Sequence, residues 1–235
     1  MIQFSNLDRV MEARDHLKNG TSSKSLMSRG KVIYSVIALI FLFLPFTLLG
    51  QMKVAYEKVE NQELSDFFRL ERIQYQKMRF TGKDLANKSY QLSVKEIWDG
   101  EITKDTIIFN SGKLFEGMGL PDYFKTVGDT ILTMRVISKL TEENKLKMEF
   151  IFPRFSIPRK FEATSSDGYR LRYAVVNETV EYGKDFYVLV YMLPYEKDNM
   201  KHYCAVEGSG KAIETWGKEF GIKHYLIFEM KFEPL

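Results

Sequence analysis

The sequence has little cysteine and histidine, with one Cys and three His in 235 residues. A lone cysteine cannot form a disulfide within the chain, which excludes a small domain held together by several disulfides. The histidines at 16, 202 and 224 show no spacing typical of a metal site. The chain also lacks a G-x-S-x-G elbow and a phosphate-binding G-x-x-x-x-G-K loop. We therefore expect no metal and no cofactor, and no motif singles out a catalytic residue.

Most of the chain also lacks an excess of positive charge. The net charge is +3, but residues 1–50 hold six Lys/Arg against three Asp/Glu, so that residues 51–235 hold 28 against 28. Domains that bind nucleic acid concentrate basic residues on the surface that meets the phosphates. The sequence therefore predicts no nucleic-acid partner.

The composition is that of a folded domain. Hydrophobic residues make up 45% and aromatic residues 14% of the chain, whereas disordered chains are poor in both. The length is typical of one main core with appended segments, since domains usually have about 100–200 residues.

One long stretch has no charged side chain. From Val32 to Gly50 there are nineteen uncharged residues, fifteen of them apolar. At about 1.5 Å rise per residue a helix of this length nearly spans the hydrocarbon core of a membrane. Basic residues precede this stretch at Lys24, Arg29 and Lys31, which favours an N-terminus in the cytoplasm. The pattern predicts a single transmembrane helix over residues 32–50.

Other interpretations of this stretch remain open. A cleaved signal peptide usually has a short basic region first, but here 31 residues precede the apolar run and no A-x-A pattern follows it. A buried core helix would be unusually long. With the anchor interpretation, residues 1–31 form a cytoplasmic tail. The rest of the chain is then periplasmic or extracellular, at a bacterial inner membrane.

The remaining chain divides into a charged segment and a strand-rich segment. Residues 51–85 contain Leu64, Phe67, Phe68 and Ile73 near helical spacing, which predicts a helical stalk. Residues 86–235 contain short β-branched and aromatic runs separated by turn residues, which predict a mainly antiparallel sheet. The runs cover residues 90–94, 105–109, 131–137, 145–152, 170–176, 186–192 and 222–232.

A helix is expected near the C-terminus. Ile213, Trp216 and Phe220 share one helical face within residues 211–220, and Gly221 is suited to end the helix. This face should pack on the sheet. The expected fold is therefore α+β, with a transmembrane helix followed by a mainly antiparallel β domain and a packed C-terminal helix.

Two features could carry chemistry, and each has a simpler explanation. His202 and Cys204 are two residues apart on a predicted strand. Their side chains would be about 6.5–7 Å apart, too far for a nucleophile and its base. The turn from Glu207 to Lys211 could bind an anion at a helix start, but a plain connecting turn is favoured.

Several residues resemble a known family. They are Leu120-Pro121-Asp122, Val127 to Leu132, Val136 to Ser138, and the run from Tyr203 to Glu214 with its E-G-x-G-K turn. These segments are similar to the GDYXXLXY family of bacterial membrane-anchored proteins, over roughly residues 120–232. Thr130, Thr133 and Arg135 stand where the family motif has Tyr, Leu and Tyr. The resemblance implies a β-rich extracytoplasmic domain without an assigned biochemical role.

The sequence therefore predicts a membrane-anchored binding or scaffolding protein, not an enzyme, in a bacterial membrane assembly. The expected partners are the membrane and other membrane or periplasmic proteins. The alternative is a membrane-tethered hydrolase that draws an acid and a base from Asp129, Glu207 and His202.

Overall fold

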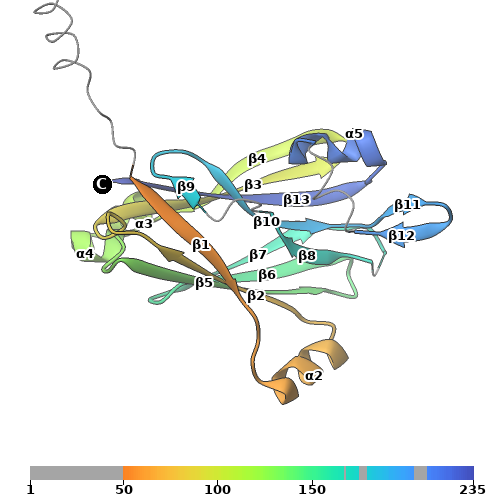
Figure 1. Ribbon diagram of the computed structural model, residues 1–235, viewed down its shortest axis with the longest axis horizontal. Helices are drawn as coiled ribbons and strands as arrows, with labels where there is room; N and C mark the ends of the chain where they lie inside the picture. Colours follow the sequence, from red (N-terminus) through yellow and green to blue (C-terminus); the bar gives the residue numbers. More distant parts are fainter. Residues whose placement is uncertain (1–49, 167, 175–178, 204–210) are drawn as a thin grey trace, which may run out of the picture. The chain divides into compact units, whose positions relative to one another are not determined.

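The structure is a computed structural model, and it describes residues 50–166, 168–174, 179–203 and 211–235. The described residues form one compact unit. Its strands are arranged in two antiparallel sheets and one separate hairpin (Figure 1).

The first sheet has six strands in the order β7-β6-β5-β2-β1-β9. Buried and exposed side chains alternate along these strands, as expected where one face of a sheet is covered. In β5, for example, Leu132, Met134 and Val136 are buried while Arg135 is exposed. The bounds are β1 Gln51–Glu57, β2 Gln74–Thr81, β5 Ile131–Leu140, β6 Lys145–Ile151, β7 Ser156–Glu162 and β9 Thr179–Glu181.

The second sheet has five strands in the order β4-β3-β13-β10-β8. Its central strand, β13, pairs with β3 over eleven residues and with β10 on its other side. The bounds are β3 Lys88–Trp98, β4 Glu101–Asn110, β8 Arg170–Tyr173, β10 Phe186–Met192 and β13 His224–Pro234. The separate hairpin consists of β11 (Tyr195–Lys197) and β12 (Met200–His202).

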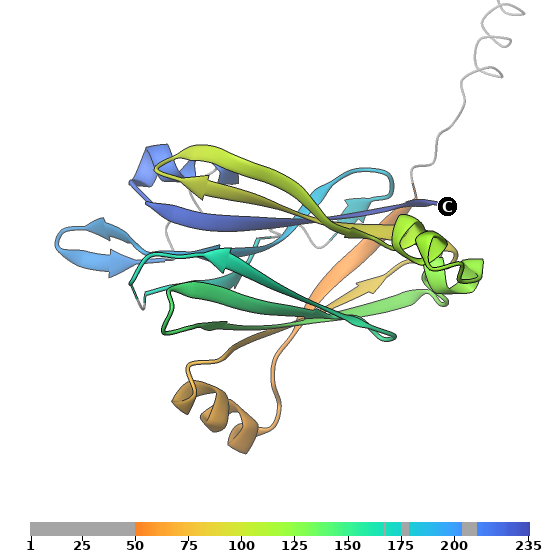
Figure 2. The ribbon, with the colours of Figure 1, turned by 180° about the vertical axis from the view of Figure 1, so that it is seen from behind.

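The two sheets pack face to face. Aromatic rings from opposite sheets meet in the core, with ring centroids 5.3 Å apart for Phe80 and Phe232 and 5.2 Å apart for Phe150 and Phe228. Figure 2 shows the two layers from behind, with β13 in one and β5 and β6 in the other. The architecture is a β-sandwich.

Short helices lie outside the two layers. Asn61 caps the first one, α2 (Gln62–Leu70), by accepting a hydrogen bond from the backbone N–H of Leu64. Two further helices, α3 (Ser111–Gly117) and α4 (Asp122–Lys125), lie in the connection between β4 and β5. A 3₁₀ turn η1 (Ile213–Thr215) and α5 (Trp216–Phe220) precede β13.

Several strand predictions are confirmed. The predicted strand at residues 186–192 coincides with β10, and residues 90–94, 105–109 and 131–137 lie within β3, β4 and β5. Two predicted turns have the positive φ angles that Gly and Asn accept: Asp99-Gly100 joins β3 to β4, and Asp198-Asn199 joins β11 to β12. Ser111-Gly112, in contrast, starts α3 instead of forming a turn.

The prediction of a helical stalk over residues 51–85 is wrong. Only Gln62–Leu70 is helical, and β1 and β2 occupy most of the rest. Met52, Val54, Met78 and Phe80 are buried through alternate positions of these paired strands. Burial of every second side chain determines the structure of this segment, because burial in a sheet overrides a weak helical pattern.

The α+β single-pass fold class is also corrected. The described domain is mainly antiparallel β, with few and short helices. Over the residues that the structure describes, no helix is long and apolar enough to cross a membrane, which leaves the membrane prediction without support. The apolar segment on which that prediction was based lies outside the described residues, except for Gly50, and so do residues 1–31.

The C-terminal helix is shorter than predicted but packs as expected. Ile213 and Trp216 are buried, and the chain leaves α5 through Gly221 at a φ of 68°. The Tyr225 hydroxyl group on β13 donates to the carbonyl of Ile213 and accepts from the backbone N–H of Gly217. This contact holds η1 and α5 against the outer face of the five-stranded sheet.

We expect Trp216→Ala to destabilise the protein by about 3–5 kcal/mol, because the side chain is 3% exposed and its loss leaves a cavity. Chemical denaturation of the full chain measures this change. Phe67→Ala is the control, since Phe67 in α2 is 53% exposed and should change the free energy of unfolding little. Equal unfolding midpoints for wild type and Trp216→Ala would show that Trp216 does not support the core.

Candidate functional site

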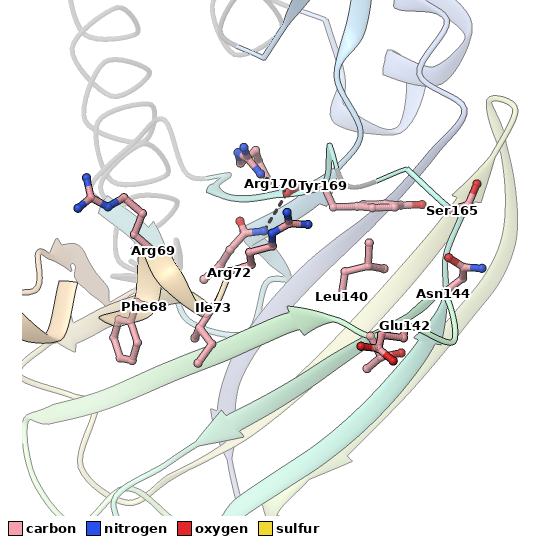
Figure 3. A pocket seen from close by; sticks show the side chains of 12 residues that line it. Phe68, Arg69, Arg72, Ile73, Leu140, Glu142, Asn144, Ser165, Tyr169 and Arg170 are labelled. Carbon is pink, nitrogen blue, oxygen red and sulfur yellow. Dashed lines mark hydrogen bonds between the residues drawn. The ribbon is translucent and has the colours of Figure 1, made fainter. Parts of the chain in front are cut away.

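A cavity of about 590 Å³ lies between the end of α2, the turn from β5 to β6, and the start of β8. Figure 3 shows arginine side chains on one side of it and Leu140, Glu142 and Asn144 on the other. The full lining is Phe68, Arg69, Arg72, Ile73, Gln74, Leu140, Thr141, Glu142, Asn144, Ser165, Tyr169 and Arg170. Three separate segments of the chain therefore build one site, which we call the arginine cavity.

The end of α2 positions Arg72. The backbone N–H of Ile73 donates to the carbonyl of Phe68 at 2.8 Å, and Arg72 has a left-handed φ of 55°. This is the helix ending in which glycine is most common at the left-handed position. Arginine holds this position at a cost in backbone strain that glycine would avoid.

The opposite wall is a tight turn. The backbone N–H of Thr141 donates to the carbonyl of Lys145 at 2.9 Å, and that of Asn144 donates to the carbonyl of Thr141. Asn144 adopts a φ of 56°, which asparagine tolerates better than most residues. The turn presents Glu142 at the rim of the arginine cavity.

Two glutamines of β2 fix β8 beside this wall. The side-chain amide of Gln74 donates to the carbonyl of Tyr169 at 2.8 Å and accepts from the backbone N–H of Leu171 at 2.6 Å. Gln76 donates to the carbonyl of Leu171 at 3.1 Å. β2 and β8 belong to different sheets, so these side-chain hydrogen bonds connect them in place of backbone pairing. They hold Arg170 on β8 near Arg72, which precedes β2.

The charge of the arginine cavity is positive. Its described lining holds three arginines and one carboxylate, Glu142. Arg69 pairs with Asp66 at 3.0 Å on the surface, where such a pair contributes little free energy. Within the part of the chain that the structure describes, no ion pair involves Arg72 or Arg170. The guanidinium group of Arg170 donates to the carbonyl of Tyr169 at 3.0 Å and lies over the ring of Tyr203, but neither contact neutralises its charge. Both arginines therefore keep a positive charge that no described carboxylate balances.

The wall at Tyr169 continues into a buried polar chain. The hydroxyl group of Tyr169 lies 2.6 Å from Nδ1 of His224 and accepts from the backbone N–H of Thr164. With Tyr169 as the donor to Nδ1, the hydroxyl group uses both its proton and a lone pair, and the proton of the neutral ring lies on Nε2. That Nε2 atom points toward Glu96 at 3.8 Å, and no described group forms a hydrogen bond with it.

The surroundings of His224 favour its neutral form. The ring is fully buried and stacks on Trp98 with centroids 3.8 Å apart. Burial lowers the pKa of His224 to about 4, although the nearby Glu96 carboxylate acts in the opposite direction. Glu96 is itself buried, and it accepts from the indole N–H of Trp98 at 2.7 Å. The buried Tyr169–His224 pair, packed against Trp98, thus supports the wall of the arginine cavity from behind.

A second cluster of charges lies on the outer face of the five-stranded sheet. Lys95 pairs with Glu229 at 2.8 Å and with Glu214 at 3.1 Å, and Tyr187 donates to Glu214. Burial opposes the charge of Lys95, but its hydrogen bonds to Glu229 and Glu214 dominate and raise its pKa. These groups satisfy one another, which indicates that they hold η1 on the sheet.

Of the three residues of the predicted hydrolase alternative, the structure describes Asp129 and His202, and it does not bring these two together. The side chain of Asp129 bonds to Thr130 next to α4, and His202 stacks near Tyr195 in the β11–β12 hairpin. Both views place α4 and this hairpin at opposite ends of the sandwich (Figures 1 and 2). Glu207 and Cys204, and with them most of the predicted anion-binding turn, lie outside the described residues.

Sequence reasoning missed the arginine cavity. Arg69, Arg72 and Arg170 look like ordinary surface charges in the sequence, and nearly a hundred residues separate Arg72 from Arg170. Their proximity depends on the pairing of β2 with β5 and on the glutamine contacts to β8. No local sequence pattern predicts these long-range contacts.

The fold and the cavity define an antiparallel β-sandwich with a basic site at the junction of its sheets. The chain matches no protein-family model, no curated protein and no solved structure. The resemblance to the GDYXXLXY family therefore stays a prediction.

We expect His224 to make stability depend on pH between about 6.5 and 4. The unfolded chain takes up a proton near pH 6.5, but the folded protein does so only near pH 4. The free energy of unfolding should therefore fall as the pH drops through this window, by roughly 3 kcal/mol from this residue. Above pH 6.5 and below pH 4 this residue adds no further pH dependence.

Chemical denaturation of the full chain from pH 7.5 to 3.5 measures this effect. His224→Gln keeps an acceptor for Tyr169 but cannot be protonated, so the wild type should lose more stability than the variant as the pH falls. Parallel curves for the two proteins would contradict the assignment.

Proposed function

We propose that this domain binds a small anionic ligand in the arginine cavity. The observation that carries the proposal is the pair of guanidinium groups, Arg72 and Arg170, that face one cavity without an acidic partner in the described residues. Guanidinium groups bind carboxylates and phosphates through two parallel hydrogen bonds. An anionic group is therefore the natural ligand between them.

The rest of the lining suggests the shape of the ligand. Phe68, Ile73 and Leu140 offer an apolar surface beside the arginines, and Glu142 offers an acceptor across from them. The volume of about 590 Å³ lies within the roughly 300–1,000 Å³ usual for small-molecule sites. The ligand would thus combine a carboxylate or phosphate with an apolar part and a hydrogen-bond donor.

Binding is favoured over catalysis by the chemistry of the walls. The described lining contains no histidine or cysteine, and the Tyr169 hydroxyl group is engaged with His224 behind the wall. A nucleophile would need a base within hydrogen-bond reach. The rigid contacts of Gln74 and Tyr169 instead favour a preformed binding site, because a preformed site loses less entropy on binding.

Calorimetry and NMR titration with phenyl phosphate, benzoate and inorganic phosphate test the proposal. We expect phenyl phosphate to bind most tightly, because it fills both the basic and the apolar part. Arg72→Gln and Arg170→Gln should each weaken it by about tenfold or more, since a charge-assisted hydrogen bond contributes about 1.5–3 kcal/mol.

Arg135→Gln is the matched control. Arg135 is an exposed arginine of β5 that does not line the arginine cavity, so its loss changes the net charge alone. Equal losses of affinity in all three variants would indicate unspecific attraction and contradict a site in the cavity. Absence of saturable binding of every probe would also contradict it.

A further inference from the structure

A second hollow, distinct from the arginine cavity, lies where the free edges of the two sheets meet. β4 is the outermost strand of the five-stranded sheet and β7 is the outermost strand of the six-stranded sheet. Between them and α3 is a groove of about 680 Å³, which we call the edge groove. It is formed by residues 107–110 of β4, by residues 113–115 of α3 with Met118 after it, and by residues 155–159 at the start of β7.

The edge groove is strongly apolar. Phe109, Phe115 and Ile157 are nearly buried and form its base, while Ile107 and Met118 are 51% and 61% exposed. Exposed apolar side chains gathered in one groove mark a binding surface more often than isolated ones do. Methionine is also flexible enough to adapt to an inserted ligand.

The rim of the edge groove is basic. Its described lining holds Lys113 and Arg159 and no carboxylate. The guanidinium group of Arg159 donates to the carbonyls of Ile108 at 2.8 Å and of Pro158 at 2.9 Å, so it is held at the rim without an acidic partner in the described chain. An apolar trough with a fixed cation fits a ligand that has an apolar body and an anionic end.

We propose that the edge groove binds a free single-chain anionic amphiphile, of the chemical class of a fatty acid. The acyl chain lies against Ile107, Phe109 and Met118, and the carboxylate meets Lys113 and Arg159. This proposal concerns a different site from the arginine cavity and does not depend on it.

An extended peptide is the less favourable occupant. It would have to pair with a free strand edge, but β4 has two register shifts against β3, and such bulges disrupt further pairing. Arg159 already occupies the carbonyl of Ile108, and Pro158 of β7 has no N–H to donate. An acyl chain needs no backbone hydrogen bonds, and it gains affinity from apolar burial alone.

Binding of decanoate and dodecanoate to the full chain, at concentrations below micelle formation, tests the proposal by calorimetry. We expect saturable binding with one site, and about threefold to fourfold tighter binding for each added methylene. Dodecyltrimethylammonium, with the same chain and the opposite charge, should bind about tenfold more weakly or worse.

Variants then locate the site. Ile107→Thr with Met118→Gln, and Lys113→Gln with Arg159→Gln, should each weaken dodecanoate by about tenfold. The matched controls are Ile102→Thr and Met200→Gln, which change exposed apolar residues outside the edge groove and should leave the affinity unchanged. Circular dichroism of each variant confirms that it is folded.

Some outcomes would overturn the proposal. These are no saturable binding of dodecanoate, equal losses in groove and control variants, or an affinity that does not depend on the sign of the head group. Binding of an acidic strand-forming peptide in the groove, without binding of dodecanoate, would also overturn it. Loss of dodecanoate binding in Arg72→Gln would assign the amphiphile to the arginine cavity, whereas retained binding there keeps the two sites separate.

Discussion

The rest of the domain depends on β13, the central strand of the five-stranded sheet. It pairs with β3 along its full length and with β10 on its other side. On its inner face Phe228 and Phe232 meet rings of the six-stranded sheet, and on its outer face Tyr225 holds η1 and α5. Its first residue, His224, begins the polar chain that supports Tyr169. Because one strand joins both layers and the polar chain, the position of the arginine cavity follows from the packing of the core.

The two sheets of the sandwich meet at two junctions with different chemistry. Where β8 lies against β2, glutamine side chains bridge the two sheets, and three arginines line the cavity beside them. Where β4 lies beside β7, the bridging group is the guanidinium of Arg159, and the hollow is apolar with a basic rim. A polar bridge keeps each junction in place while leaving space beside it, which explains how a tightly packed sandwich can hold two hollows.

The sequence could predict the strands better than the site, for physical reasons. The alternation in β5, the continuous apolar run of β10, and the Asp-Gly and Asp-Asn turns are local signals, so they could be read directly. The segment of β1 and β2 was misassigned because the helical spacing of Phe67 and Phe68 extends for only one short helix, whereas the partners that bury Met52 and Met78 are distant in the sequence. Arg72 and Arg170 line one cavity only through long-range contacts, and the pKa of His224 is lowered because Trp98 and the core bury the ring. Propensity and spacing cannot report such contacts.

The central claim is that the packing of the sandwich builds a preformed anion site between Arg72 and Arg170. A crystal structure of the protein with 4-bromobenzoate tests it most directly, because the anomalous scattering of bromine locates the ligand without ambiguity. The account predicts one strong bromine peak in the arginine cavity, with the carboxylate within hydrogen-bond distance of both guanidinium groups and the ring against Phe68 or Leu140. Bromine peaks elsewhere with this cavity empty, or guanidinium groups bound to carboxylates of the protein itself, would contradict it.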